Sequence, residues 1–286
     1  MKLGVFSFNT EYTMRADELA VAAEERGFES IWFPEHTHIP ASRLSPWPGK
    51  GPLPKEYIHM SDPFTSAAAA AAVTKTIKLG TGVCLVVEHD PLALAKTVAT
   101  VDRLSNGRFL FGVGAGWNRE EMENHGTPFD RRWKVLEERV KAMKALWTQE
   151  EASFHGEYVN FDRVWSYPKP IQQPHPPVIL GTFGSIWGRK RVADFGDGWI
   201  PIDLFHGDLK ADIADLRRRL IDNGRDPDAV TISMFDIFET SEEDLRRFAD
   251  LGVVTRAIPR CPTEDRDTVL RWLDRYAEIG RRIGAL

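Results

Sequence analysis

The stretch TVATVDRLSNGRFLFGVGAG, residues 97–116, decides the fold expected for this chain. Apolar and small residues recur at helical spacing as far as Leu104, and the Ser-Asn-Gly at 105–107 then predicts a tight turn, because Asn and Gly tolerate a positive φ. The apolar run that follows predicts a short buried strand, which ends in Gly114-Ala115-Gly116. A strand that ends in bare backbone is where many α/β proteins hold a phosphate or a flat ring.

Working outward, strand-like and helix-like segments alternate along all 286 residues. Strands are expected at residues 3–8, 30–33, within 77–87, and at 108–113, 178–181, 198–202, 230–235 and 253–258. Helices are expected at 15–26, 62–75, 91–104, 131–147, 187–195, 209–223, 242–251 and 268–283. Eight strands, each followed by a helix, predict an α/β protein with a single (β/α)8 TIM-barrel domain over residues 1–286. A doubly wound open sheet is the alternative, although it usually has fewer units at this length.

Two long irregular segments interrupt the alternation. Residues 40–60 follow the second strand and are rich in Pro and Gly, and residues 150–177 lie between the fourth and fifth strands. Loops of this length inside a compact fold are usually binding loops or lids. For the second segment, a small hairpin or a dimer contact is an equally good interpretation.

Composition excludes several classes of protein. A net charge of −5 argues against a nucleic-acid partner on electrostatic grounds. The two cysteines, Cys84 and Cys261, are too few for a disulfide framework and fit a reducing cytoplasm. The start of the chain lacks the apolar core of a signal peptide, and no stretch approaches the roughly 20 apolar residues of a membrane helix. We therefore expect a soluble cytoplasmic protein without a membrane partner.

The end of the second strand carries the strongest candidate for chemistry. Ligands of such barrels bind at the C-terminal ends of the strands, and this strand runs into Glu35-His36 and then His38. The near-neutral pKa of an ordinary histidine suits proton transfer, which makes His36 the candidate acid or base. Glu35 could orient that ring or accept a hydrogen bond from a ring amide of a ligand. The alternative is that the pair only caps the loop.

A Glu-His-x-His string also resembles a metal site. A third ligand is not evident, since Asp62, His89 and Asp90 form no recognisable pattern with it, and no metal is predicted. The sequence also lacks a GxSxG elbow, a P-loop and zinc-type Cys/His spacing.

Other strand ends are rich in glycine. The third strand ends in Gly80-Thr81-Gly82-Val83-Cys84, whose glycines allow the close approach of a ring, with an ordinary strand bulge as the alternative. Gly184-Ser185 follow the fifth strand directly before a helix, where backbone N–H groups can hold an anion. The basic run at 189–191 on that helix is better explained as a solvated face. A glycine-lined barrel mouth with one good acid–base histidine indicates a large flat cofactor, which supplies the difficult chemistry itself.

Three motifs carry a family resemblance over essentially the whole chain: GFESIWFPEHTHIP (27–40), LGTGVCLVVEHDPLALAKTVATVDRLSNGRFLFGVGAGWNREEMENHG (79–126), and YPKPIQQPHPPVILGTFGS with VADFGDGWIP (within 167–201). The chain resembles the luciferase-like flavin and deazaflavin oxidoreductases. The acid–His end of the second strand is most similar to the branch that uses coenzyme F420, an 8-hydroxy-5-deazaflavin. The resemblance implies a barrel that forms a homodimer.

The resemblance also implies roles for particular residues. The cofactor ring would pack against the end of the third strand, at Thr81, Gly82 and Val83, with a non-prolyl cis peptide near Gly82–Val83. His36 matches the active-site histidine and Glu35 the acid that contacts the ring. The phosphate-bearing tail would lie along two segments: Gly114, Ala115 and Gly116, and Gly184 and Ser185 with Trp187 and Gly188.

One departure from the family concerns the substrate. The sugar-phosphate dehydrogenases of this family carry a catalytic Glu just after the GxG, where this chain has Trp117, and the sequence gives Glu120 no role in its place. The predicted function is therefore an F420-dependent oxidoreductase that transfers a hydride between C5 of the deazaflavin and an organic substrate of unspecified identity. The alternatives are an FMN-dependent monooxygenase that uses reduced flavin and oxygen, and a non-catalytic cofactor-binding protein.

Overall fold

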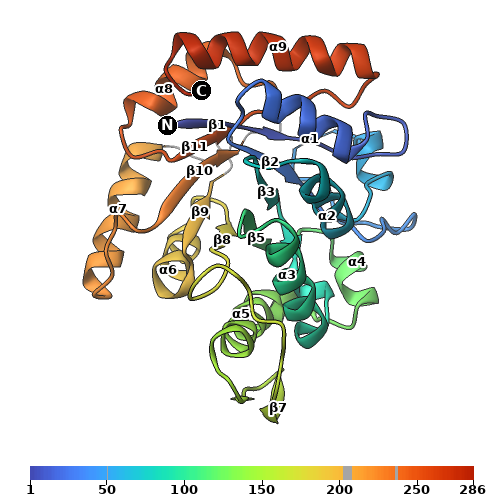
Figure 1. The fold of residues 1–286 in the computed structure, drawn as a ribbon. Helices are drawn as coiled ribbons and strands as arrows, with labels where there is room; N and C mark the ends of the chain where they lie inside the picture. Colours follow the sequence, from blue (N-terminus) through green and yellow to red (C-terminus); the bar gives the residue numbers. More distant parts are fainter. Residues whose placement is uncertain (50, 202–207, 236–237) are drawn as a thin grey trace.

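The computed structural model describes residues 1–49, 51–201, 208–235 and 238–286. Eight parallel strands form a closed barrel with helices packed around it (Figure 1). Neighbours around the barrel follow the order β3-β2-β1-β11-β10-β9-β8-β5, and pairing of β3 with β5 closes it. The strands are β1 (Lys2–Phe6), β2 (Ser30–Phe33), β3 (Lys78–Thr81), β4 (Cys84–Leu85), β5 (Phe109–Gly114), β6 (Ala152–His155), β7 (Asn160–Val164), β8 (Val178–Gly181), β9 (Gly198–Ile200), β10 (Thr231–Phe235) and β11 (Arg256–Ile258).

Helices alternate with the barrel strands, as the sequence predicts. They are α1 (Ala16–Glu25), α2 (Pro63–Val73), α3 (Pro91–Leu104), α4 (Arg119–Asn124), α5 (Arg132–Thr148), α6 (Ile186–Phe195), α7 (Leu209–Asp222), α8 (Glu242–Asp250) and α9 (Arg266–Arg282). Short 3₁₀ turns lie at η1 (Lys55–Ile58), η2 (Val86–Glu88) and η3 (Phe129–Arg131). Among the described helices, none has the length and apolar character needed to span a membrane.

The TIM-barrel prediction is confirmed, and β2, β8 and α3 have the predicted bounds. The sequence did not predict β4 or α4. The segment expected at 150–177 contains the antiparallel hairpin β6–β7, which projects beyond α5 (Figure 1). Part of the strand expected at 198–202 falls on residue 202, outside the described residues; β9 itself ends at Ile200.

The turn between α3 and β5 shows why the 97–116 stretch is so distinctive. Asn106 and Gly107 both have positive φ, of 55° and 76°, as the turn prediction requires. The fully buried Asp102 carboxylate accepts hydrogen bonds from the backbone N–H groups of Ile171 and Gln172, at 2.7 and 3.0 Å. Arg108 donates to the carbonyl groups of Ala71 and Thr74 at the end of α2, at 3.2 and 3.0 Å. The charged residues of this motif therefore serve the fold.

Trp32 fills the interior of the barrel. Its indole is fully buried and donates to Ser30 Oγ at 2.9 Å. A Cβ on Gly80 of β3 would lie within 3 Å of three carbons of that indole, and a Cβ on Gly112 of β5 would collide with the Thr81 carbonyl oxygen. These glycines are needed because the ring and the backbone already occupy the space that a side chain would take.

We predict that Gly80→Ala lowers the free energy of unfolding by about 3 kcal/mol, because a rigid buried ring must move to admit one methyl group. Urea unfolding of a double-mutant cycle with Trp32→Phe is the measurement. The smaller ring should make room for the methyl group, so Gly80→Ala should cost less in the Trp32→Phe background. Equal costs in both backgrounds would show that the ring does not impose the glycine.

Candidate active site

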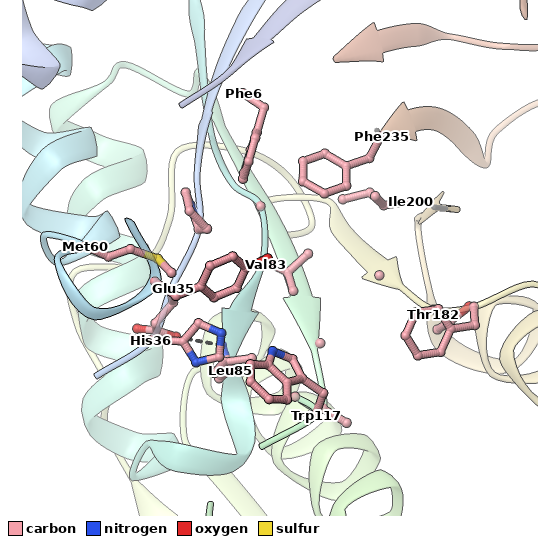
Figure 2. Close-up of a pocket in the computed structure, with 18 of the residues that line it drawn as sticks. Phe6, Glu35, His36, Met60, Val83, Leu85, Trp117, Thr182, Ile200 and Phe235 are labelled. Atoms are coloured by element: carbon pink, nitrogen blue, oxygen red, sulfur yellow. Dashed lines mark hydrogen bonds between the residues drawn. The ribbon is translucent and has the colours of Figure 1, made fainter. Parts of the chain in front are cut away.

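A cavity of about 170 Å³ opens among the C-terminal ends of the barrel strands. In the view of Figure 2, Thr182 and Ile200 lie on the opposite side of the cavity from Glu35 and His36. Its walls are mostly apolar, and no Lys or Arg is among the described residues that line it. The lining comprises Phe6, Phe8, Pro34, Glu35, His36, Tyr57, Met60, Gly82, Val83, Leu85, Gly114, Ala115, Gly116, Trp117, Trp133, Gly181, Thr182, Phe183, Ile200 and Phe235.

His36 is held by Glu121. The ring Nδ1 lies 2.6 Å from Glu121 Oε2, and the other carboxylate oxygen accepts the backbone N–H of Thr37 at 3.0 Å. The His36 side chain is only 6% exposed and that of Glu121 is fully buried. A carboxylate on Nδ1 fixes the proton there and leaves the Nε2 lone pair for a ligand in the cavity. This arrangement suits a general base that becomes an imidazolium.

Glu35 does not orient His36, which corrects one expectation from the sequence. Its Oε2 accepts the backbone N–H of Leu85 at 2.6 Å, and its Oε1 lies 2.9 Å from His89 Nε2. Glu35, Cys84 and His89 bring one ligand-type atom each to within 4.8 Å of one another. Burial and the Glu35 carboxylate raise the pKa of the Cys84 thiol well above its usual value. The thiol therefore keeps its proton, and the three groups form a hydrogen-bonded cluster that ties β2 to β4.

Glu88 is the most strongly perturbed acid near the site. Burial, reinforced by the Glu121 and Glu35 carboxylates and a hydrogen bond with Glu121, raises the pKa of Glu88 to about 9. For His89, burial acts in the opposite direction, but the hydrogen bond and charge of Glu35 raise its pKa. Three acids thus meet behind His36, and one of them remains protonated at neutral pH.

The loop at 40–60 supplies the aromatic side chain of Tyr57 to the cavity. Tyr57 lines it, with its ring 5.5 Å from the His36 ring and 5.9 Å from that of Trp47. Glu120 holds the other part of this loop by accepting the N–H groups of Leu44 and Ser45, at 2.6 and 3.1 Å. Hydrogen bonds from Ser45 and Leu44 lower the pKa of Glu120 to about 2. The loop therefore contributes to the cavity, as a binding loop would.

Most of the predicted site residues meet in this cavity. Glu35, His36, Gly82, Val83, Gly114, Ala115 and Gly116 all line it. The predicted Gly82–Val83 cis peptide is confirmed. Their contacts with a cofactor remain predictions.

Other predicted residues lie elsewhere. Thr81 is fully buried outside the cavity lining and donates its hydroxyl proton to the Gly112 carbonyl at 2.6 Å, so its side chain serves the barrel wall. Ser185 caps α6 by accepting the Gly188 N–H at 3.1 Å. Gly184, Ser185, Trp187 and Gly188 lie next to Phe183, at the edge of the cavity rather than in its lining. The tail of a bound cofactor would have to leave the cavity to reach them.

Sequence reasoning missed Glu121 and the phenylalanines of the cavity floor. Phe6, Phe8 and Phe235 lie at or just beyond the ends of β1 and β10. The alternation of Phe6 and Phe8 was the available signal, because residues two apart share one face of a strand. Nothing local marked Glu121, which meets His36 across 85 positions of sequence.

Comparison with known proteins identifies the family. Residues 1–282 match the family described as luciferase-like monooxygenase. The chain belongs to this family. It is 40% identical over 284 residues to the uncharacterized protein Rv0953c of Mycobacterium tuberculosis, covering 97% of this chain and 98% of that protein.

Relatives with named activities use two different cofactors. An FMNH(2)-dependent dimethylsulfone monooxygenase of Pseudomonas putida is 31% identical over 64% of this chain and 50% of its own length. An F420-dependent glucose-6-phosphate dehydrogenase of Amycolatopsis mediterranei is 32% identical over 64% of this chain and 51% of its own length. The chain spans only about half of each. The family relatives therefore show a flavin-type cofactor without showing which one.

Solved structures agree on the fold. The monooxygenase RslO1 of Streptomyces bottropensis superimposes with a TM-score of 0.69 at 23% identity, covering 100% of this chain and 83% of that one. An F420-dependent secondary alcohol dehydrogenase bound to an F420-acetone adduct gives 0.66 at 20% identity, covering 97% and 90%. At these identities the likeness concerns the barrel alone.

We predict that Glu88 makes the protein less stable as the pH rises. Its pKa in the folded chain lies above the unfolded value, so the folded state binds more protons between pH about 4.5 and about 9, and the free energy of unfolding falls across that window. Glu88→Gln should flatten this decline, measured by urea unfolding from pH 5 to 9. Glu123→Gln on the exposed face of α4 is the control and should leave the decline unchanged. Parallel curves for the wild type and Glu88→Gln would contradict the protonated state of Glu88.

Proposed function

We propose that the chain is an F420-dependent oxidoreductase that acts on an uncharged organic substrate. The observation that carries this proposal is a buried His36–Glu121 pair at the edge of an apolar cavity. Such a pair is suited to moving one proton at a substrate atom while a hydride moves elsewhere.

The cavity fits a flat ring. Gly82, Gly114, Gly116 and Gly181 present backbone, and Val83 stands between them with its methyl groups next to the space above Gly114 and Gly181. Bare backbone provides N–H and C=O partners for the polar edge of a ring, and the apolar walls favour its face. When bound there, the deazaflavin would supply or accept the hydride at C5.

The protein's own part in the reaction is proton handling. In substrate oxidation, Nε2 of His36 would accept the hydroxyl proton, and Glu121 would stabilise the resulting imidazolium through Nδ1–H. In the reverse direction His36 would return that proton to the product oxygen. The apolar walls around the ring exclude water from the reacting atoms.

The charge of the lining indicates the substrate class. Glu35 is the acid among the described lining residues, and no described basic side chain other than His36 faces it. A phosphate group brought into this cavity would lack a cationic partner, so its desolvation would be uncompensated. The presence of Trp117, where the sugar-phosphate dehydrogenases of the family carry a catalytic Glu, also argues against a phosphorylated sugar as substrate. We therefore favour uncharged alcohols, ketones or activated alkenes over phosphorylated sugars.

An FMN-dependent monooxygenase is the second candidate, supported by the Pseudomonas putida relative. Fluorescence titration of the purified protein with oxidised F420 and, separately, with FMN distinguishes the two. Micromolar or tighter binding of F420 alone would support the proposal and justify a screen of uncharged alcohols and ketones. Binding of FMN alone would overturn it, and oxygen uptake with reduced FMN would then be measured.

We predict that His36→Ala keeps the affinity for F420 within about threefold but lowers kcat by a factor on the order of 10²–10⁴, because it removes the acid–base group and not the ring contacts. Steady-state kinetics and the same titration give the two numbers. His155→Ala, on the exposed hairpin, is the control for loss of a histidine. Unchanged kcat in His36→Ala would remove this residue from the reaction, and a protein that binds F420 but turns over no substrate would favour a binding module.

A further inference from the structure

Behind His36 lies a group of acids and histidines outside the cavity lining. Glu121 contacts His36, Glu88 hydrogen-bonds to Glu121, and His125 follows at the end of α4. They come from three separate parts of the chain, namely the end of β2, η2 and α4. Their side chains run from 6% exposed at His36, through 0% at Glu121 and 1% at Glu88, to 28% at His125. The series therefore begins in the cavity, crosses a buried layer and ends at the surface.

The Glu88–Glu121 contact requires a shared proton. Two carboxyl groups can hydrogen-bond to each other only when one of them is protonated. Glu88 carries that proton, because burial and the nearby carboxylates raise its pKa to about 9. The pair is thus a neutral acid bonded to a carboxylate, and the same carboxylate is bonded to His36.

The outer end of the series has a matching acceptor. Glu88 Oε2 is buried, makes no hydrogen bond within the described structure and lies 3.8 Å from His125 Nε2. The same nitrogen lies 2.7 Å from the Thr37 hydroxyl, so transfer from Glu88 requires His125 to exchange this hydrogen bond. Burial and the neighbouring His38 lower the pKa of His125, so a proton that reaches this ring is released readily to water. One water molecule, or a small rotation of either side chain, closes a gap of this length.

We propose that Glu121, Glu88 and His125 form a proton route that connects His36 in the cavity to solvent on the outside of the barrel. The route rests on the proposed role of His36. The route would matter most for proton exchange when cofactor and substrate fill the cavity, because His36 then loses its direct access to water.

The transfers balance. After His36 accepts a substrate proton at Nε2, the Nδ1–H bond breaks and an O–H bond forms on Glu121. The Glu88 O–H then turns from Glu121 toward His125 and gives its proton to that ring, which releases it to water, and Glu121 passes its new proton to the Glu88 carboxylate. One proton leaves the cavity, and Glu121, Glu88 and His125 return to their starting protonation states. His36 is left neutral with its proton on Nε2 instead of Nδ1, so the ring must exchange that proton with water after the product leaves and recover the Nδ1–H form before the next cycle. The same steps in reverse deliver a proton to the substrate.

Several charged groups face this route from the elements packed around it. Glu35 at the end of β2 and Glu121 on α4 act on Glu88. His38 and His89, together with Glu35 and Glu121, act on His125. A titration must therefore separate Glu88 from these neighbours, which a Glu88→Gln comparison does.

We predict that His36 and His125 sense the same titration step. In protein without cofactor, labelled with ¹⁵N-histidine, long-range ¹H–¹⁵N spectra from pH 5 to 10 should show a chemical-shift change in both rings near pH 9, where Glu88 loses its proton. Glu88→Gln should abolish this change in both rings, and Glu123→Gln should leave it intact. A change confined to one ring, or one that persists in Glu88→Gln, would overturn the route. Because no cofactor is needed, this result is independent of the choice between F420 and FMN.

Chemical rescue tests the outer end of the route. With a substrate from the F420 screen, His125→Ala should lower kcat on the order of tenfold with little change in KM, and added imidazole should restore it. Glu88→Gln should show a similar loss that imidazole does not restore, since its block is buried. His125→Gln serves as the second variant if His125→Ala fails to fold. Full kcat in the His125 variant would overturn the route even if the enzyme uses F420 as proposed.

Discussion

The interior of the barrel is organised around the Trp32 indole. It occupies space that a side chain on β3 would otherwise take, so its presence imposes Gly80, while the Thr81 carbonyl beside the ring imposes Gly112 on β5. Above it, the buried Phe6, Ile200 and Phe235 form the floor of the cavity (Figure 2). The depth of the cavity is therefore fixed by close packing: the floor residues rest on the Trp32 ring and have no space to move further into the barrel.

Near this floor, the repulsion between buried carboxyl groups is relieved in two ways. Three carboxyl groups meet in a region of low dielectric, where three negative charges would repel one another strongly. Glu35 is stabilised by a backbone N–H and His89, and Glu121 by His36 and the Thr37 N–H. Glu88 has neither arrangement and stays neutral. The environment of His36 therefore depends on Glu121 and Glu88, which lie outside the cavity lining.

The sequence predicted the barrel well because its signals are local. Periodicity, the Asn106-Gly107 turn and the Pro91 start of α3 each act within a few residues, and the structure has these features where they were expected. The strand-end rule then located Glu35, His36 and the glycines in one cavity. The rule could not say which acid would meet His36, because Glu35 is its neighbour in sequence and Glu121 is its neighbour in space. The motif residues Asp102 and Arg108 are distinctive in sequence, yet their contacts are structural: Asp102 ties α3 to the backbone at 171–172, and Arg108 ties the start of β5 to the end of α2. Local sequence signals cannot give such results, because contacts between distant segments form only in the assembled fold. The same contacts decide whether a charged residue has a structural or a chemical role.

Glu120 and Glu121 are adjacent residues of α4 that bind different parts of the structure. Glu120 binds the backbone of the loop at 40–60 through Leu44 and Ser45, and Glu121 binds His36 at the edge of the cavity. Glu120 binds the main chain of the loop, so these hydrogen bonds do not depend on which side chains the loop carries. Substitution of the loop's aromatic side chains would therefore change the wall of the cavity beside Tyr57 while leaving the main-chain hydrogen bonds to Glu120 and the His36–Glu121 contact in place.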